Sequence, residues 1–94
     1  MKLRRIKYSF CNDTFSITKP HEIIRETEKC YFVKDGNGEY RFIKAEIGKP
    51  IMKNFTDHPH IMLTMIDTDA NTMKEVLAGW FTDRAENILK QVIL

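Results

Sequence analysis

The sequence predicts an α+β domain: five or six short antiparallel strands forming a curled sheet or small open barrel, packed by one long C-terminal α-helix. Two observations predict this class. Over residues 1–66, short runs of apolar residues, several of them alternating with polar residues, are separated by turn-forming residues. From Thr72 onward, apolar residues recur with the period of a helix. We expect a single domain over residues 1–94, β-rich over 1–66 and helical over about 70–93.

The first element expected is a hairpin. Residues 3–10 alternate apolar and polar side chains, which is typical of a half-buried strand. Asn12 and Asp13 are turn residues that tolerate positive φ. A two-residue turn there would place Phe10 opposite Phe15 and Tyr8 opposite Ile17, so that all four apolar groups share one face.

Pro20 ends this hairpin, because proline has no N–H to give to a strand ladder. A short strand is expected over residues 22–27. Residues 44–50 could form one helical turn before Gly48 and Pro50. Residues 53–59 are expected to be a loop, and residues 60–66 form the last expected strand, because they are apolar and partly β-branched.

A second hairpin is expected over residues 29–43, turning at residues 35–38 (Asp-Gly-Asn-Gly). The sequence is compatible with two registers for this hairpin. A two-residue loop pairs Val33 with Tyr40, whereas a three-residue loop pairs Phe32 with Phe42. Large apolar groups lie on both faces of the first strand, which indicates a strand covered on both sides.

The C-terminal helix carries the strongest periodic signal. Its start is expected between Asp69 and Thr72, where several side chains could accept N-cap hydrogen bonds. An isolated helix of this length is marginal in water, so its apolar stripe must be covered by the sheet or by a second copy of the chain. Residues 73–81 are expected in the core, whereas residues 88–94 carry more apolar surface than a small sheet can cover. The stripe consists of Met73, Val76, Leu77, Trp80, Phe81, Ile88, Leu89 and Val92.

Charge is distributed unevenly along the chain. The first 53 residues contain 12 Lys/Arg and 7 Asp/Glu, and the remainder contains 3 and 6, for a net charge of +2. Such asymmetry can mark a surface for an acidic partner. No apolar run approaches 18 residues, and residues 6–17 do not form the apolar segment of a signal peptide. We therefore expect no membrane association and a cytoplasmic protein.

No residue pattern indicates catalysis, a metal or a cofactor. Cys11 and Cys30 have no metal-ligand spacing and are expected to be reduced thiols. His58 and His60 would point to the same side of a strand beside Asp57, but spacing specifies no further ligand. Phosphate-binding and nucleophile motifs are absent from the sequence. The chain is expected to be neither an enzyme nor a cofactor protein.

Two stretches resemble short uncharacterised proteins of phages and mobile elements. One is a strand pattern T-x-K-x-Y-x-V and the other a returning strand R-x-x-K-x-E-I-G-K, here at residues 27–33 and 41–49. The resemblance covers about a quarter of the chain, to a loose class rather than a defined family. It implies a small single-domain protein that binds a host or viral macromolecule, in the style of anti-CRISPR inhibitors, and supplies no catalytic residues.

The first functional hypothesis is protein binding. The partner would be a host or defence complex, modulated or inhibited by contact in the host cytoplasm, or a second copy of the chain in a homodimer. The residues expected to make that contact lie at the apolar end of the helix: Ile88, Leu89, Val92, Ile93 and Leu94.

The alternative hypothesis is a nucleic-acid-binding accessory protein. Basic residues interleaved with aromatic residues on a small sheet are typical of single-strand binders. The candidates lie on the N-terminal hairpin and the strands that follow it: Lys2, Arg4, Arg5, Lys7, Arg25 and Lys29.

Overall fold

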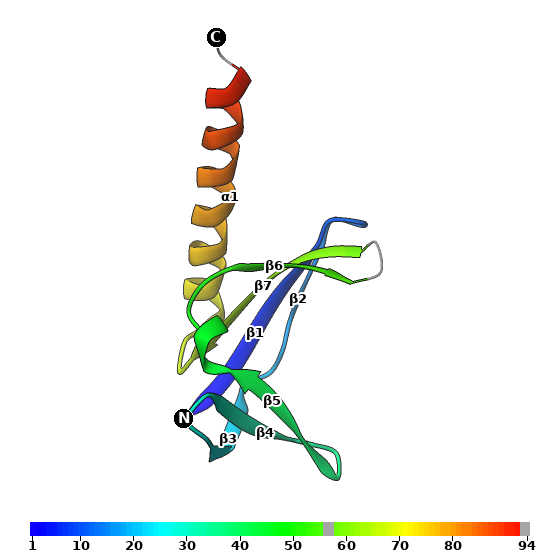
Figure 1. Ribbon diagram of the computed structural model, residues 1–94, viewed down its shortest axis with the longest axis vertical. Coiled ribbons are helices and arrows are strands. Elements are labelled where there is room, and N and C mark those ends of the chain that lie inside the picture. The colour runs from blue at the N-terminus through cyan, green and yellow to red at the C-terminus, as the bar shows by residue number, and fades with distance from the viewer. Residues whose placement is uncertain (56–57, 93–94) are drawn as a thin grey trace.

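The computed structural model describes residues 1–55 and 58–92 and confirms the α+β class: a curled antiparallel sheet packs against one C-terminal helix (Figure 1). The described residues form seven strands, one 3₁₀ turn and one α-helix. In order these are β1 (Lys2–Ser9), β2 (Thr14–Ile17), β3 (His21–Glu26), β4 (Cys30–Asp35), β5 (Gly38–Ile43), η1 (Lys44–Glu46), β6 (Ile51–Phe55), β7 (His58–Ile66) and α1 (Ala70–Val92).

The sheet is built around β1 and β7. Its strand order is β5-β4-β3-β1-β7-β6, and β2 pairs with β1 beside β3. The β1–β7 ladder runs from Leu3 opposite Ile66 to Ser9 opposite His60. On the other edge of β1, β2 pairs with residues 6–9 and β3 with residues 2 and 3. A strand pair that supports neighbours on both edges lies at the centre of the sheet.

Both faces of this central pair are buried, in two separate cores. Alternate residues of a strand point to opposite faces. One face packs against α1 through Ile6, Ile61, Leu63, Met73 and Leu77. The other face is covered where β3, β4 and β5 curl over it, through Leu3, Val33 and Phe42, with Ile23, Ile47 and Ile66 at the margin.

The curl of the sheet has a local cause in β3. The β3–β4 register shifts between Ile23 and Arg25, so Ile24 is an irregularity in the ladder and is half exposed. Such a bulge bends its strand and increases the local twist. It therefore helps turn β4 and β5 away from the plane of β1 and over one face.

The register expected for the first hairpin is wrong. Tyr8 pairs with Phe15 and Ile6 with Ile17, so the loop is two residues longer than a tight turn at Asn12-Asp13. Phe10 lies in the four-residue loop between the paired residues Ser9 and Thr14, and its backbone N–H donates to the Pro59 carbonyl, 3.1 Å away. The shift is an even number of residues, so the apolar groups still share one face.

The second hairpin adopts the two-residue loop. Val33 pairs with Tyr40 and Tyr31 with Phe42, and Gly36 in the turn has a φ of +58°. A left-handed backbone of this kind suits glycine. The apolar side chains on both faces of β4 are also explained, because Val33 is buried and Phe32, on the other face, lies under the Arg25 guanidinium at 3.8 Å.

The expectation of a loop over residues 53–59 is wrong for its first part. Residues 51–55 form β6, which pairs with β7 from Ile51 opposite Met62 to Phe55 opposite His58. β6 has no regular apolar alternation, and its strand conformation is supported by backbone bonds to an apolar neighbour. β7 also begins two residues earlier than expected, at His58.

The helix begins at Ala70 with Asp69 as its N-cap. The Asp69 carboxylate accepts a hydrogen bond from the Thr72 backbone N–H at 2.7 Å and one from the Thr72 hydroxyl at 3.1 Å. These bonds satisfy one of the free N–H groups at the helix start. They also lower the pKa of Asp69 below its ordinary value of 3.8, the backbone bond being the larger cause.

Only the first half of α1 covers the sheet. Met73 and Leu77 are buried, and Val76, Trp80 and Phe81 pack at the edge of that core. The helix of 23 residues is about 34 Å long, and Figure 1 shows its C-terminal half rising beyond the strands. The radius of gyration, 15.2 Å, exceeds the roughly 12 Å of a compact chain of this length, in agreement with a projecting element.

Replacing one leucine in each half of α1 by alanine tests whether both halves are packed. Leu77→Ala should lower the free energy of unfolding by about 2–5 kcal/mol, because it leaves a cavity in the core. Leu89→Ala should change it by less than about 0.5 kcal/mol, because Leu89 is 57% exposed. Urea denaturation followed by circular dichroism measures both. Equal losses would show that the helix is packed along its whole length.

The N-cap predicts a pH dependence. A carboxyl whose pKa is lower in the folded than in the unfolded chain stabilises the fold above the unfolded pKa, and that contribution is lost as pH falls through the folded pKa. The melting temperature of wild type should therefore exceed that of Asp69→Asn at neutral pH, and the gap should narrow below pH 3.8. A gap independent of pH would mean that the carboxylate charge contributes nothing to the cap.

Candidate functional site

The apolar end of the helix is exposed, as expected for a contact surface. Ile88 is 50% and Leu89 57% exposed, and both lie on the half of α1 that projects beyond the strands. Val92 is the last residue of α1, and the structure does not describe its side chain. Ile93 and Leu94 lie outside the described residues. Of the five predicted contact residues, only Ile88 and Leu89 have side chains that the structure describes.

An apolar groove lies at the base of this projecting half. It has a volume of about 510 Å³ and lies between β2 and the first half of α1. Phe15 of β2 is 58% exposed at one wall, and its ring lies 4.8 Å from that of Tyr8. The residues that line this helix-base groove are Phe15, Lys74, Leu77, Ala78 and Phe81.

The basic residues predicted on the N-terminal hairpin do not form one patch. Because β1 alternates, Arg5 and Lys7 lie on the concave face of the curled sheet, opposite the helix. Arg4 instead donates from Nε to the Thr18 carbonyl at 3.0 Å. Lys2 and Lys29 are exposed and line neither cavity of the concave face.

Arg25 is occupied on the outer face of β3. Its guanidinium contacts the Glu39 carboxylate at 2.7 Å and lies over the Phe32 ring. The hydrogen bond between the two side chains raises the pKa of Arg25 and lowers the pKa of Glu39. Lys44 is paired with Glu26 in the same way, and that bond raises the pKa of Lys44. Arg25 and Lys44 are therefore each paired with a carboxylate.

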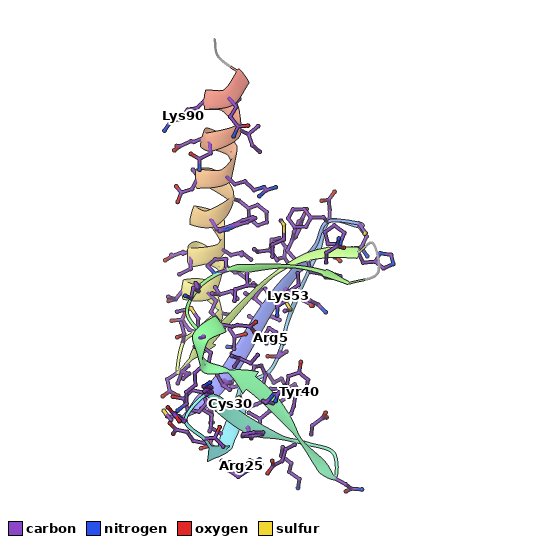
Figure 2. The ribbon with its side chains drawn as sticks, viewed as in Figure 1. Arg5, Arg25, Cys30, Tyr40, Lys53 and Lys90 are labelled. Atoms are coloured by element: carbon purple, nitrogen blue, oxygen red, sulfur yellow. The ribbon has the colours of Figure 1, made fainter. Side chains whose placement is uncertain are left out.

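The concave face holds a cluster of cations that the sequence did not reveal as a group. Two cavities of about 300 and 210 Å³ share Arg5 and Tyr40 as lining residues and so adjoin one another. Figure 2 shows Lys53, Arg5 and Tyr40 in succession from β6 to β5. We call the two cavities together the concave trough, lined by Arg5, Lys7, Thr18, His21, Val33, Lys34, Asp35, Tyr40, Arg41, Phe42, Ile43, Glu46, Lys53 and Met62.

Cys11 and His58 form a further contact that the sequence did not indicate. The first hairpin loop brings the Cys11 sulfur to 3.2 Å from Nδ1 of His58, at the start of β7. Both side chains are exposed. Within the described residues, no group of three His, Cys, Asp or Glu is arranged to hold a metal ion.

Comparison with protein-family models, curated proteins and solved structures finds no match to this chain. Over residues 1–55 and 58–92, no helix combines the length and apolar character needed to cross a bilayer. Two surfaces of the molecule are therefore candidates for function: the helix end with its groove, and the concave trough.

Proposed function

We propose that this chain is a non-enzymatic binding protein that works through protein–protein contact, and that its contact element is the projecting half of α1. The observation that supports this is the exposure of Ile88 and Leu89 on a helical segment that no described strand covers. Exposed apolar area on a free helix is unfavourable in water, and a helix segment without tertiary packing is marginally stable. A partner surface would relieve both.

A second copy of the chain fits this surface. Phe81 and Ile88 are seven residues apart, so they recur on the same helix face after two turns. Ala85 lies between them on that face and allows close approach of another helix. In an antiparallel pair with its twofold axis near Ala85, Ile88 of each copy would lie against Phe81 of the other. A twofold interface needs this self-complementarity.

The helix-base groove favours the same occupant. Ile88 of the second copy would enter the groove beside Phe81, where Leu77, Ala78 and Phe15 provide apolar walls. Among the described residues that line the groove, Lys74 alone is charged. By the helical period, Asp83 and Glu86 fall on the side of α1 away from Phe81, so like charges would not face one another.

The wider role that we propose is modulation or inhibition of a host or defence complex in the host cytoplasm. This extension rests on the resemblance of residues 27–49 to phage and mobile-element proteins. In this reading the chain is phage- or mobile-element-encoded, and the dimer is the form that engages the complex.

Light scattering after size exclusion tests self-association. The wild type should approach twice the chain mass of 11.1 kDa as its concentration rises through the micromolar range. Ile88→Asp should remain monomeric, because a charge would be buried against Phe81. Asn87→Asp makes the same charge change on the neighbouring face and should dimerise as the wild type does.

Two results would contradict the proposal. A wild type that is monomeric at every concentration would remove the second copy as occupant. A dimer that persists in Ile88→Asp would place the interface elsewhere. Circular dichroism spectra of both variants should match the wild type, because both positions are exposed.

A further inference from the structure

We propose that the concave trough binds a single strand of nucleic acid, its phosphates held by the trough's cations and a base stacked on Tyr40. This is a different surface from the helix end, on the opposite face of the sheet. It is also a different set of residues from the predicted hairpin patch, of which only Arg5 and Lys7 remain.

The charge of the trough is strongly positive. Its lining contains five Lys or Arg side chains and two carboxylates, Asp35 and Glu46. Glu46 is paired with Lys53 at 2.8 Å. Within the part of the chain that the structure describes, no carboxylate lies within ion-pair distance of the other four cations. Cations gathered in a recess without acidic partners raise the local concentration of anions. These four are Arg5 and Lys7 of β1, which project from the concave face, and Lys34 and Arg41, which line the trough from the β4–β5 hairpin, where the register places them on the face that carries Phe32 and Glu39.

Arg5 is held in place for such a ligand. Its Nε donates to the hydroxyl of buried Thr64 at 2.9 Å, and its guanidinium lies 4.7 Å from the centre of the Phe42 ring. This bond uses one of the five N–H donors of arginine. Among the described residues, the other four have no protein acceptor. The fork geometry of these donors matches phosphate oxygens.

Arg25 provides an internal comparison. It also lies over an aromatic ring, but on the outer face of β3 its guanidinium is neutralised by Glu39 at 2.7 Å. Of these two arginines, Arg25 is therefore paired with an acid on the convex side, and Arg5 is left without one on the concave side. This difference favours the concave side as the anion-binding face.

Tyr40 supplies the aromatic surface that a base requires. It lines both cavities, is 46% exposed, and packs edge to face on Phe42 with ring centres 5.0 Å apart. The Phe42 contact supports the ring while leaving much of it open. An exposed ring among basic residues is the arrangement with which sheets stack single-stranded bases.

The shape of the trough favours a single strand over a duplex. Proteins that read a duplex insert a helix or ribbon into its grooves. Here the cations line a recess to which β1, β5, β6 and β7 contribute residues, and a recess suits an extended strand better than the groove of a duplex. An acidic peptide could satisfy the cations, but its carboxylates would make no use of Tyr40, so stacking distinguishes the two ligands.

Fluorescence anisotropy with a labelled mixed-sequence DNA oligonucleotide, and its RNA counterpart, tests the proposal. Binding should be detected at about 50 mM salt and weaken as salt rises. Lys7→Gln/Arg41→Gln should reduce affinity about tenfold or more and lower the slope of log K against log salt by about 1.4, for two single-strand phosphate contacts. The control Lys2→Gln/Lys29→Gln removes the same charge outside the trough and should bind nearly as well as wild type.

Tyr40→Ala should weaken binding by about 5- to 150-fold, because stacking is lost, whereas Tyr40→Phe should bind as the wild type does. Ile88→Asp should also bind normally, so failure of the dimer and failure of the trough are separable results. Absence of binding at low salt, or equal loss in the two double variants, overturns the proposal. The proposal is also overturned if polyglutamate binds as tightly as the oligonucleotide and neither affinity changes in Tyr40→Ala.

Discussion

The pairing of β1 with β7 is the constraint on which the rest of the fold depends. Seven residue pairs join the two strands, and the Lys2 carbonyl and N–H both bond to Asp67 at the end of the ladder. The pair is buried on both faces, since Ile6, Ile61 and Leu63 face the helix while Leu3 packs under β4 and β5. Each face of the pair thus supports one of the two cores. Loss of this ladder would separate the helix from the curled strands, because among the described residues only those of β1 and β7 contribute strand positions to both cores.

This arrangement divides the molecule into an apolar and a basic side. On the helix side, the sheet is too small to cover α1, so Ile88 and Leu89 extend beyond it into solvent. On the concave side, β3 to β5 curl over Leu3, and Phe42 of β5 packs in the same core. The Arg5 guanidinium lies over the Phe42 ring at the edge of that core. The two proposed binding surfaces are therefore the two regions where residues next to a core remain exposed. A protein contact and a nucleic-acid contact could be made at once, since they lie on opposite faces.

Local periodicity predicted much of the fold, and non-local pairing explains what it missed. The alternation of residues 3–10 and the helical spacing after Thr72 predicted elements whose faces the structure confirms. β6 was missed because Ile51–Phe55 has no regular alternation of its own and is held by β7. The register of the first hairpin was missed because the two registers differ by two residues, so both place the apolar groups on one face and alternation alone cannot choose between them. The trough was missed because Arg5, Tyr40 and Lys53 belong to three strands that are distant in sequence and lie near one another only in the folded sheet, whereas Arg25 is paired with Glu39.

Backbone amide hydrogen exchange tests whether the β1–β7 pair is buried on both faces while the helix is packed over only half its length. The Ile88→Asp variant should be used, so that self-association does not protect the helix end. The amides of Ile6, Ile61 and Leu63 should exchange slowest, close to the rate set by global unfolding, and residues 73–80 should follow. Residues 84–91 should exchange orders of magnitude faster, because local fraying opens an unpacked helix segment. Uniform protection along α1 in this variant, or β1 and β7 amides that exchange as fast as those of β2, would contradict the account.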